Sequence, residues 1–369
     1  MSKLSIVQLS SVHPTRDTRV FYKICKGLVK KGHDLELIIQ HPKDEILEGI
    51  RIKSLPIAKS KVERFLKVVP TLLKKARKYP KSAIMHFHDP ELIPIGILLK
   101  ILGYTVIYDV HEDVTKDMLT KEWIPKPLRS FLSYSLGRLE ALSSRIFDGI
   151  VTVTDPIAER FMRSTQSVVQ VRNYPIIPSK SVIQSDIERK YIAYIGGITT
   201  RRGIPKIVDA IEKVEPEHIK LWLGGTFAEK GLFESVKTKK GWDRTNFLGW
   251  VNHDEMIEIL RHAICGLLTL EVIPSHNESL NVKMFEYMLC GIPVVSSDLK
   301  LPKQIINEHQ AGIIIRENTP EEIAKAVEYL YSNPNEAKEM GRRGQEAVMK
   351  FYNWENELDK LESFYRKLI

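Results

Sequence analysis

The sequence predicts an α/β protein of two Rossmann-like domains, each with a mostly parallel sheet covered by helices on both faces. Three observations predict this fold class. Short apolar strands alternate with helix-length segments along both halves of the chain. The alternation stops near the middle, where Pro175 and Pro178 mark an extended segment typical of a linker. The chain of 369 residues also has the length of two ordinary domains.

The first predicted domain covers residues 1–172. Its strand candidates are apolar runs rich in β-branched residues, at 5–9, 34–40, 83–87, 105–108 and 149–153. Its helix candidates have apolar residues at helical spacing, at 17–31, 59–81, 91–102, 128–144 and from Asp155. This alternation implies a parallel sheet, and ligands of such sheets bind at the carboxyl ends of the strands.

Residues 173–189 form the predicted linker and residues 190–352 the second domain. The strand candidates of the second domain are 191–195, 219–223, 246–248, 265–270, a run from 294 and 313–315. Its helix candidates begin at Gly203, Asp254, Val282, Thr319 and Pro334. The second domain therefore repeats the α/β pattern of the first.

The composition is that of a soluble globular protein, with 43% hydrophobic and 27% charged residues. The first ten residues lack the long apolar core of a signal peptide and predict a strand instead. The longest apolar run, 92–99, contains Pro94 and ends at Lys100, which argues against a bilayer span. Three cysteines have no metal or redox spacing. We therefore expect a cytoplasmic protein with reduced thiols.

Positive charge is concentrated in the first domain, where residues 1–172 contain 29 Lys and Arg against 18 Asp and Glu. The segment from Lys59 to Lys81 has nine basic residues and one acid, Glu63, with apolar residues interleaved at helical spacing. Such a helix can lie on an anionic membrane surface, and a solvated helix face explains the charge equally well. A nucleic-acid partner is not expected, because no recognisable binding motif accompanies the charge.

The stretch 277–295 carries the most informative pattern. Apolar residues at helical spacing follow Asn281, Gly291 is placed to end the helix, and Val294 begins a buried strand. The backbone N–H groups of Ser279, Leu280 and Asn281 are then expected at an uncapped helix start, which is a site for an anionic ligand.

Two carboxylates, Glu278 and Glu286, accompany this helix start. They suggest a ligand rich in both phosphate and hydroxyl groups, such as a nucleotide sugar, although an amphipathic helix with two solvated acids has the same spacing. The stretch resembles the Glu-x7-Glu signature of family 4 glycosyltransferases, followed by their Glu-Tyr-Met-x-x-Gly-x-Pro-Val-Val run. The resemblance implies that Glu278 approaches the donor sugar and that Glu286 binds the ribose.

The same resemblance implies the GT-B architecture, two facing Rossmann-like domains with the site in the cleft between them. The closing segment 353–369 is similar to the family's last helix, which usually crosses back to the first domain. The resemblance also implies a retaining transfer, in which the acceptor hydroxyl attacks on the face from which the nucleotide diphosphate departs.

A glycine turn follows the first strand of the second domain and opens a helix. Glycines let a ligand approach the backbone closely, and arginines donate to phosphate oxygens. The turn resembles the glycosyltransferase segment Gly-Arg-x4-Lys-Gly, with Arg202 at the Lys position and Gly197 at the Arg position. This departure removes one phosphate contact, and Lys283 on the opposite helix is placed to supply the second charge.

Polar residues also follow strands of the first domain. His111 lies after one strand, where a metal ligand, an acid/base group and a structural role are all open, and it resembles the family's strand-end histidine beside the donor sugar and acceptor hydroxyl. His88 and Asp89 end the preceding strand and are candidates for the acceptor side.

The segment after the first strand lacks the glycines of many relatives. Here Asp17 is placed to cap the first helix, and Arg16 and Arg19 are expected to be exposed to a charged acceptor.

We therefore expect a retaining glycosyltransferase that moves a hexosyl or N-acetylhexosaminyl group from a nucleotide-diphosphate sugar, with UDP favoured by family frequency. The acceptor is expected to be a saccharide or lipid-linked saccharide of bacterial surface polysaccharide, at the inner face of the membrane. The sequence contains no Asp-x-Asp pair, so no metal and no cofactor are expected. A nucleotide-sugar epimerase of this architecture and a non-catalytic sugar-nucleotide-binding or membrane-binding assembly protein are the alternatives.

Overall fold

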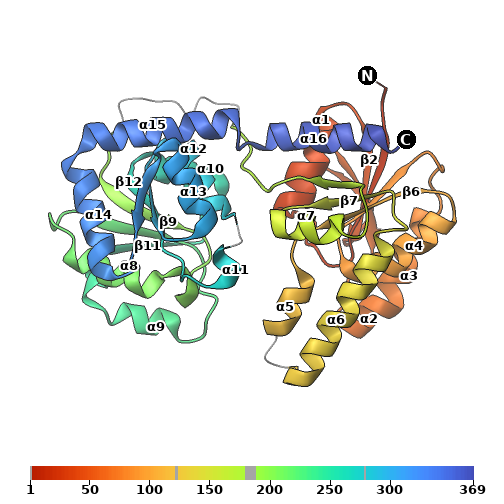
Figure 1. Cartoon of the computed structure of the whole chain (residues 1–369), viewed down its shortest axis with the longest axis horizontal. Coiled ribbons are helices and arrows are strands. Elements are labelled where there is room, and N and C mark those ends of the chain that lie inside the picture. Colours follow the sequence, from red (N-terminus) through yellow and green to blue (C-terminus); the bar gives the residue numbers. More distant parts are fainter. Residues whose placement is uncertain (1, 121–123, 179–187, 278–279) are drawn as a thin grey trace. The chain divides into compact units, whose positions relative to one another are not determined.

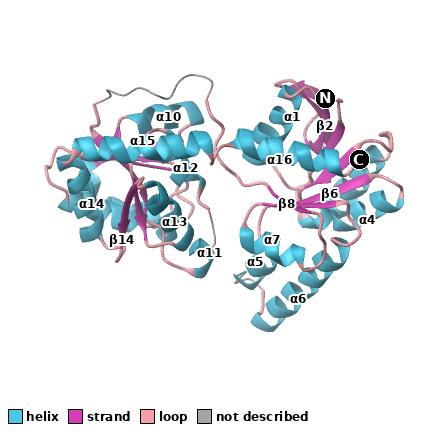
Figure 2. Cartoon of the chain, turned by 45° about the horizontal axis from the view of Figure 1, so that its top comes forward, coloured by secondary structure: helices cyan, strands magenta, loops and turns pink. Residues whose placement is uncertain are grey.

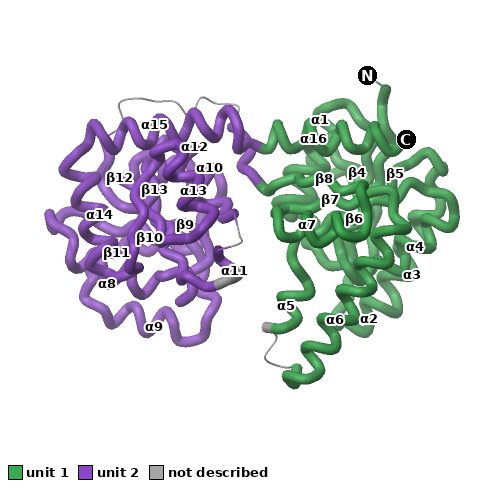
Figure 3. The backbone as a smooth tube through the Cα atoms, in the orientation of Figure 1, with its two compact units in different colours: residues 1–173, 354–369 green, residues 174–353 purple. Residues whose placement is uncertain are grey.

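A computed structural model describes residues 2–120, 124–178, 188–277 and 280–369 (Figure 1). The chain divides into two compact units (Figure 3). Unit 1 comprises Met1–Asn173 and Trp354–Ile369, and unit 2 comprises Tyr174–Asn353. Each unit has a sheet between helices (Figure 2), so the predicted α/β fold class is confirmed.

The sheet of unit 1 has eight strands in the order β3-β4-β2-β1-β5-β6-β7-β8. All neighbouring strands are parallel except β3 and β4. The strands are β1 Ser5–Leu9, β2 Asp34–Gln40, β3 Glu45–Leu47, β4 Ile50–Leu55, β5 Ile84–Phe87, β6 Thr105–Val110, β7 Gly149–Thr152 and β8 Val168–Gln170. The central strands are almost entirely buried, which is why they form apolar runs in the sequence.

The helical segments of unit 1 connect these strands, with the last one coming from the end of the chain. They are η1 Thr18–Cys25, α1 Lys26–Lys30, α2 Lys61–Glu63, η2 Arg64–Val68, α3 Val69–Ala76, η3 Pro90–Leu92, α4 Ile93–Ile101, α5 Val114–Thr120, α6 Lys126–Ser143, α7 Asp155–Met162 and α16 Trp354–Lys367. Asp17 caps η1 by accepting from the backbone N–H groups of Arg19 and Val20, as predicted.

Unit 2 has a six-stranded parallel sheet in the order β11-β10-β9-β12-β13-β14. Its strands are β9 Tyr191–Ile195, β10 Lys220–Gly224, β11 Thr245–Gly249, β12 Ala263–Leu268, β13 Val294–Ser297 and β14 Gly312–Ile315. Its helical segments are η4 Thr200–Arg202, α8 Ile204–Lys213, α9 Leu232–Lys237, η5 Lys240–Arg244, α10 His253–Arg261, α11 Pro274–Asn277, α12 Val282–Leu289, α13 Lys300–His309, α14 Pro320–Ser332 and α15 Pro334–Lys350.

Both sheets reverse their winding direction beside their first strand. In unit 1 the chain proceeds outward from β1 to β2 on one side and from β5 to β6 on the other. In unit 2 the same reversal occurs between β9 and β12. In open parallel sheets, the carboxyl ends of the strands at such a reversal point form the usual ligand site.

The C-terminal helix α16 is an integral part of unit 1. The indole N–H of Trp354 donates to the backbone oxygen of Lys23 at 3.0 Å. Gly149, at the start of β7, leaves room for the helix, because a Cβ there would lie 2.6 Å from the ring of Phe364. Tyr365 is fully buried and reaches the polar side chains of β1 and β5.

Several local predictions need correction. The helix predicted over residues 59–81 is present but shorter: α2, η2 and α3 follow one another without a break from Lys61 to Ala76, with a π-helical stretch in the middle. Val68, Leu72 and Ala76 are buried in the core, whereas Phe65 and Leu66 are exposed. Strands β3, β4 and β8 were not predicted, because these short strands lack a long apolar run. Within the described ranges, no helix is long and apolar enough to span a bilayer.

Candidate active site

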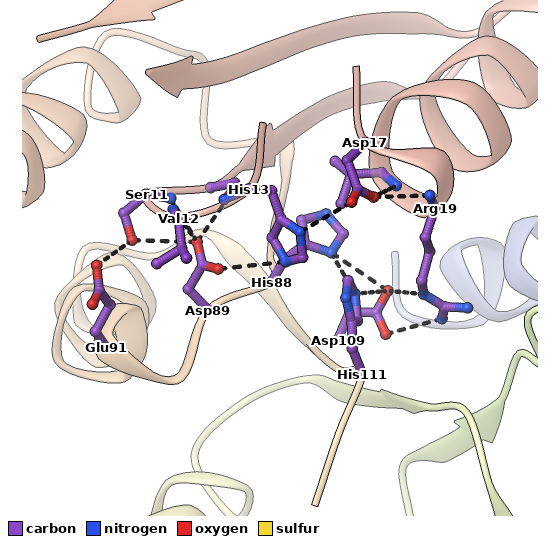
Figure 4. A network of polar contacts seen from close by, with 12 residues as sticks. Ser11, Val12, His13, Asp17, Arg19, His88, Asp89, Glu91, Asp109 and His111 are labelled. Carbon is purple, nitrogen blue, oxygen red and sulfur yellow. Dashed lines mark hydrogen bonds and ion pairs between the residues drawn. The ribbon is translucent and has the colours of Figure 1, made fainter. Parts of the chain in front are cut away.

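Polar side chains gather at the carboxyl edge of the unit 1 sheet (Figure 4). Ser11 and His13 follow β1, His88 and Asp89 follow β5, and His111 follows β6. Because β1, β5 and β6 are neighbours in the sheet, these distant parts of the chain meet at one place. The cluster therefore lies at the reversal point of the sheet, where ligands bind in this class of fold.

The centre of the cluster is a buried ion pair between Asp109 and Arg19. Arg19 donates to the Asp109 carboxylate through Nε at 3.3 Å and through Nη2 at 3.0 Å, and its Nη1 donates to the backbone oxygen of Val171 at 3.0 Å. Burial alone would raise the pKa of Asp109, but the charge of Arg19 and the hydrogen bond from His111 hold this pKa well below its usual value. Asp109 is therefore ionised, although its side chain is fully buried.

His111 and His88 contact the same carboxylate. His111 Nε2 lies 3.1 Å from Asp109 Oδ2 and 3.1 Å from His88 Nδ1, and His88 Nε2 lies 2.7 Å from Gln8 Oε1. Burial lowers the pKa of His88 to about 4, so this imidazole is neutral at neutral pH. A neutral His88 that donates to Gln8 through Nε2 has Nδ1 as an acceptor, and His111 then directs its Nε2–H toward Asp109 and His88.

Tyr365 of the C-terminal helix α16 extends this hydrogen-bond network. Tyr365 Oη lies 2.5 Å from His86 Nδ1, and Gln8 Nε2 donates to Tyr365 Oη at 3.3 Å. Gln8 is thereby held with its carbonyl oxygen toward His88. Residues on β1, β5, β6 and α16 thus fix the orientation of His88 and His111 through a continuous chain of polar contacts.

His13 lies on the open side of the cluster. Its ring centroid is 5.1 Å from that of His111, and its two nitrogens lie 3.4 Å from Asp17 Oδ2 and 3.5 Å from Asp89 Oδ1. Burial alone would lower the pKa of His13, but the bond to Asp17 and the charge of Asp89 raise it overall. Asp89 also accepts from Ser11 N at 2.5 Å, so it holds the segment after β1 in place.

A metal ion has one possible donor set among the described residues. One nitrogen each of His86 and His88 and one oxygen of Asp109 lie within 4.8 Å of one another, all buried. Arg19, however, binds both oxygens of Asp109, and Gln8 binds His88 Nε2. Hydrogen bonds thus already engage Asp109 and His88, whereas His86 Nε2 is buried without a hydrogen-bond partner, 3.8 Å from Asp109 Oδ2.

A second polar cluster lies at the carboxyl end of β9 in unit 2. The backbone oxygen of Gly197 accepts from Arg202 Nη1 at 3.0 Å and from Tyr194 Oη at 2.9 Å, so the guanidinium folds over the turn. Gly196 has φ of +141°, and a Cβ there would collide with the end of the Lys283 side chain. The two glycines therefore let both cations converge on one short piece of backbone.

Lys283 is the second residue of α12. Its Nζ lies 5.3 Å from the centroid of the Tyr194 ring. Burial, together with the charge of Arg202, lowers the pKa of Lys283 to about 8, and the charge of Glu286 opposes this shift. A desolvated ammonium beside a guanidinium is a site that a bound polyanion would stabilise.

The start of α12 differs from the expectation of an uncapped helix. Asn281 is the N-cap, and its side chain accepts from the backbone N–H of Lys283 at 3.1 Å. Leu280 packs partly buried against the core of unit 2. The predicted site residues Glu278 and Ser279 lie outside the described residues.

Comparison with known proteins identifies the family. Residues 18–171 match the model of glycosyltransferase family 4, and residues 178–347 match the model of glycosyl transferases group 1. The chain is a family 4 glycosyltransferase. The α-maltose-1-phosphate synthase of Mycolicibacterium smegmatis is 24% identical over 276 residues, 66% of this chain and 71% of that protein. The D-rhamnosyltransferase WbpZ of Pseudomonas aeruginosa is 21% identical over 286 residues, 74% of this chain and 71% of that protein.

Solved structures confirm that this glycosyltransferase has the GT-B fold. A glycosyltransferase from Rickettsia africae aligns with a TM-score of 0.72 and 14% identity, over 100% of this chain and 99% of that one. HepE of Anabaena, in complex with UDP-glucose, aligns with a TM-score of 0.70 and 13% identity, over 99% of this chain and 100% of that one.

The structure brings together most of the predicted residues that it describes. His88, Asp89 and His111 meet in unit 1, and Gly197, Arg202 and Lys283 meet in unit 2. Arg16 is exposed and pairs with Glu48 at 3.4 Å. The expectation that Arg19 is exposed is wrong, because Arg19 is buried and paired with Asp109.

Sequence reasoning did not predict the pairing of Arg19 with Asp109, and it assigned no site role to His13 of this glycosyltransferase. A carboxylate near the end of the apolar run 105–110 signals a buried cation nearby, because a buried charge must be paired. The sequence does not indicate which cation pairs with Asp109. The structure shows that it is Arg19, in the first helical segment of the chain.

Proposed function

We propose that this glycosyltransferase is a retaining enzyme that transfers a hexosyl or N-acetylhexosaminyl group from a UDP-sugar. The convergence of Arg202 and Lys283 on the turn Gly196–Gly197 carries this proposal. Two cations beside exposed backbone complement the two phosphates of a nucleotide diphosphate. The solved complexes of HepE with UDP and with UDP-glucose support UDP as the nucleotide.

The transfer proceeds without a metal ion or cofactor in this proposal. Negative charge accumulates on the departing diphosphate as the bond to the sugar breaks, and preorganised cations stabilise that charge. Arg202 and Lys283 supply two positive charges, and the N-terminal end of α12 adds its partial charge beside Lys283. These groups do the work that a divalent ion does in metal-dependent transferases.

His111 acts at the reaction centre. Its Nε2–H is directed toward Asp109 and His88, so Nδ1 of a neutral His111 has the lone pair that accepts a hydrogen bond from a sugar hydroxyl. His88 and Asp89 position the acceptor side, and exposed Arg16 faces a charged acceptor. By resemblance to the family, Glu278 contacts the donor sugar and Glu286 binds the ribose.

The proposed acceptor is a saccharide or lipid-linked saccharide of a bacterial surface polysaccharide. The enzyme then works in the cytoplasm, bound peripherally to the inner face of the cell membrane. The basic segment from Lys59 to Lys81 supports this location, because it combines nine cations with the exposed apolar side chains of Phe65 and Leu66.

A thermal-shift panel of UDP-, GDP-, ADP- and dTDP-sugars, each with and without EDTA, tests the donor and the absence of a metal. A ligand at 100 times its dissociation constant stabilises the fold by about 2.7 kcal/mol, which is easily seen as a higher midpoint. We expect a UDP-sugar to give the largest shift, unchanged by EDTA and reduced in Arg202→Ala. A shift that EDTA abolishes contradicts the metal-independent mechanism, and no shift with any sugar nucleotide contradicts the donor assignment.

The stereochemical outcome needs a separate measurement. Proton NMR of the product formed from an α-linked UDP-sugar distinguishes the two anomers by their coupling constants. We expect an α-linked product, and a β-linked product would contradict the retaining mechanism.

A further inference from the structure

Helix α6 carries its apolar side chains on the outside of unit 1. Leu128, Phe131, Leu139 and Leu142 recur at helical spacing and are 46, 64, 40 and 52% exposed. Tyr134, beside them, is 68% exposed. A surface helix normally turns such a stripe toward the core, so this arrangement is the reverse of the expected one.

The fully buried residues of α6, Glu140 and Ser143, are polar or small. Ser133 donates through Oγ to the backbone oxygen of Thr115 in α5 at 2.8 Å. Buried Glu140 binds Arg160 of α7 at 2.7 Å and accepts from Tyr108 Oη at 3.1 Å. Polar contacts therefore hold the helix to the unit and leave its apolar side turned outward.

The charged side chains that α6 exposes to solvent are all basic. Residues 126–145 contain four basic residues, Lys126, Arg129, Arg138 and Arg145, and one acid, Glu140, which is buried and paired. A helix with an apolar stripe, an aromatic residue and exposed cations has the composition of an interfacial helix on an anionic bilayer.

The helices next to α6 extend this surface. Helix α4 contacts both α6 and α3, and its Leu98 and Ile101 are exposed. The segment before α3 exposes Phe65 and Leu66 and belongs to the basic stretch 59–81. We call α6, α4 and the segment 61–68 the apolar-basic layer.

We propose that the apolar-basic layer docks on an anionic lipid bilayer, with the outer side of α6 entering the headgroup region. Basic residues outnumber acids in this layer, whose Glu63 pairs with Lys67 and whose Glu140 pairs with Arg160. This excess of positive charge favours a lipid surface over a second copy of this chain, because two copies of this layer would bring like charges together. The inference rests on the proposed lipid-linked acceptor only for its biological purpose. It adds α6 to the segment 59–81 as the principal membrane contact.

Flotation with vesicles of phosphatidylcholine mixed with phosphatidylglycerol, against vesicles of phosphatidylcholine alone, tests this proposal. The full-length protein should float with the anionic vesicles and lose binding at high salt. In Phe131→Ser and Leu142→Ser, the partition constant should fall about tenfold for each side chain. In Lys126→Gln and Arg145→Gln, it should fall roughly fivefold for each charge. The control is Ile46→Ser, at a site 71% exposed on β3, and it should bind as the wild type does.

Three outcomes overturn the proposal: no flotation with anionic vesicles, flotation that the α6 variants leave unchanged, or a dimer in sedimentation that Phe131→Ser dissolves without any vesicle binding. The variants sit on the surface, so an unchanged melting temperature verifies their fold. Binding of UDP-sugars, followed by thermal shift without vesicles, should be equal in all of them. Loss of vesicle binding with intact donor binding thus separates this inference from the proposed function.

Discussion

Replacing Arg19 by Met should cost unit 1 a large part of its stability. The substitution keeps most of the side-chain volume and leaves the carboxylate of Asp109 buried without its guanidinium. Breaking a buried ion pair by removing one partner costs about 3–5 kcal/mol, against about 5–15 kcal/mol for the stability of a whole protein. Asp109→Asn should cost a similar amount, because it leaves Arg19 as the unpaired charge.

The double variant separates the charge interaction from other effects. With both charges absent, Arg19→Met/Asp109→Asn should lose less stability than the sum of the single losses, by about 1–3 kcal/mol. Hydrogen exchange followed by mass spectrometry measures this, because peptides from β1 and β6 report on unit 1 while peptides from β9 provide an internal reference. The matched control is the exposed pair of Arg342 with Glu339, where Arg342→Met should cost less than about 1 kcal/mol.

The pH dependence has a definite sign. The pKa of Asp109 is lowered in the folded protein, so its contribution to stability is present above the unfolded pKa of about 3.9 and is lost as pH falls toward the folded pKa. Asp109→Asn should remove this part of the acid sensitivity. If Arg19→Met left the exchange of β6 within about 1 kcal/mol of the wild type, the central role of the ion pair would be refuted.

The other predictions concern the cluster in unit 2. Arg202→Ala should lower turnover by about 10²–10³, because one preorganised charge donor is lost, and wild-type turnover would remove Arg202 from the mechanism. Glu286→Ala should weaken donor binding by about 1–3 kcal/mol in calorimetry, for loss of a ribose partner, and an unchanged affinity would contradict that role. Donor affinity should fall as pH rises through about 8, because the ammonium of Lys283 loses its proton there and no longer offsets the diphosphate. Lys283→Gln should bind the donor weakly and without this pH step, whereas a persisting step would assign the titration to another group.

Local patterns in the sequence determined much of the fold. The strands 5–9 and 191–195 were predicted with the bounds that the structure has, because apolar, β-branched runs leave few other conformations for a short segment. Asp17 was predicted as a helix cap, because capping depends only on neighbouring residues. The strand-end positions of His88 and His111 followed from the same local reading.

Three features of this protein were decided by the tertiary structure. The pairing of Arg19 with Asp109 depends on the packing of the first helical segment against β6, which lies far along the chain. The approach of His13 to His111 depends on the strand order β1-β5-β6. The exposure of the apolar side of α6 depends on the polar contacts that its opposite side makes with α5 and α7. Helical periodicity reveals that an apolar stripe exists, but long-range contacts decide whether that stripe is buried or faces a partner.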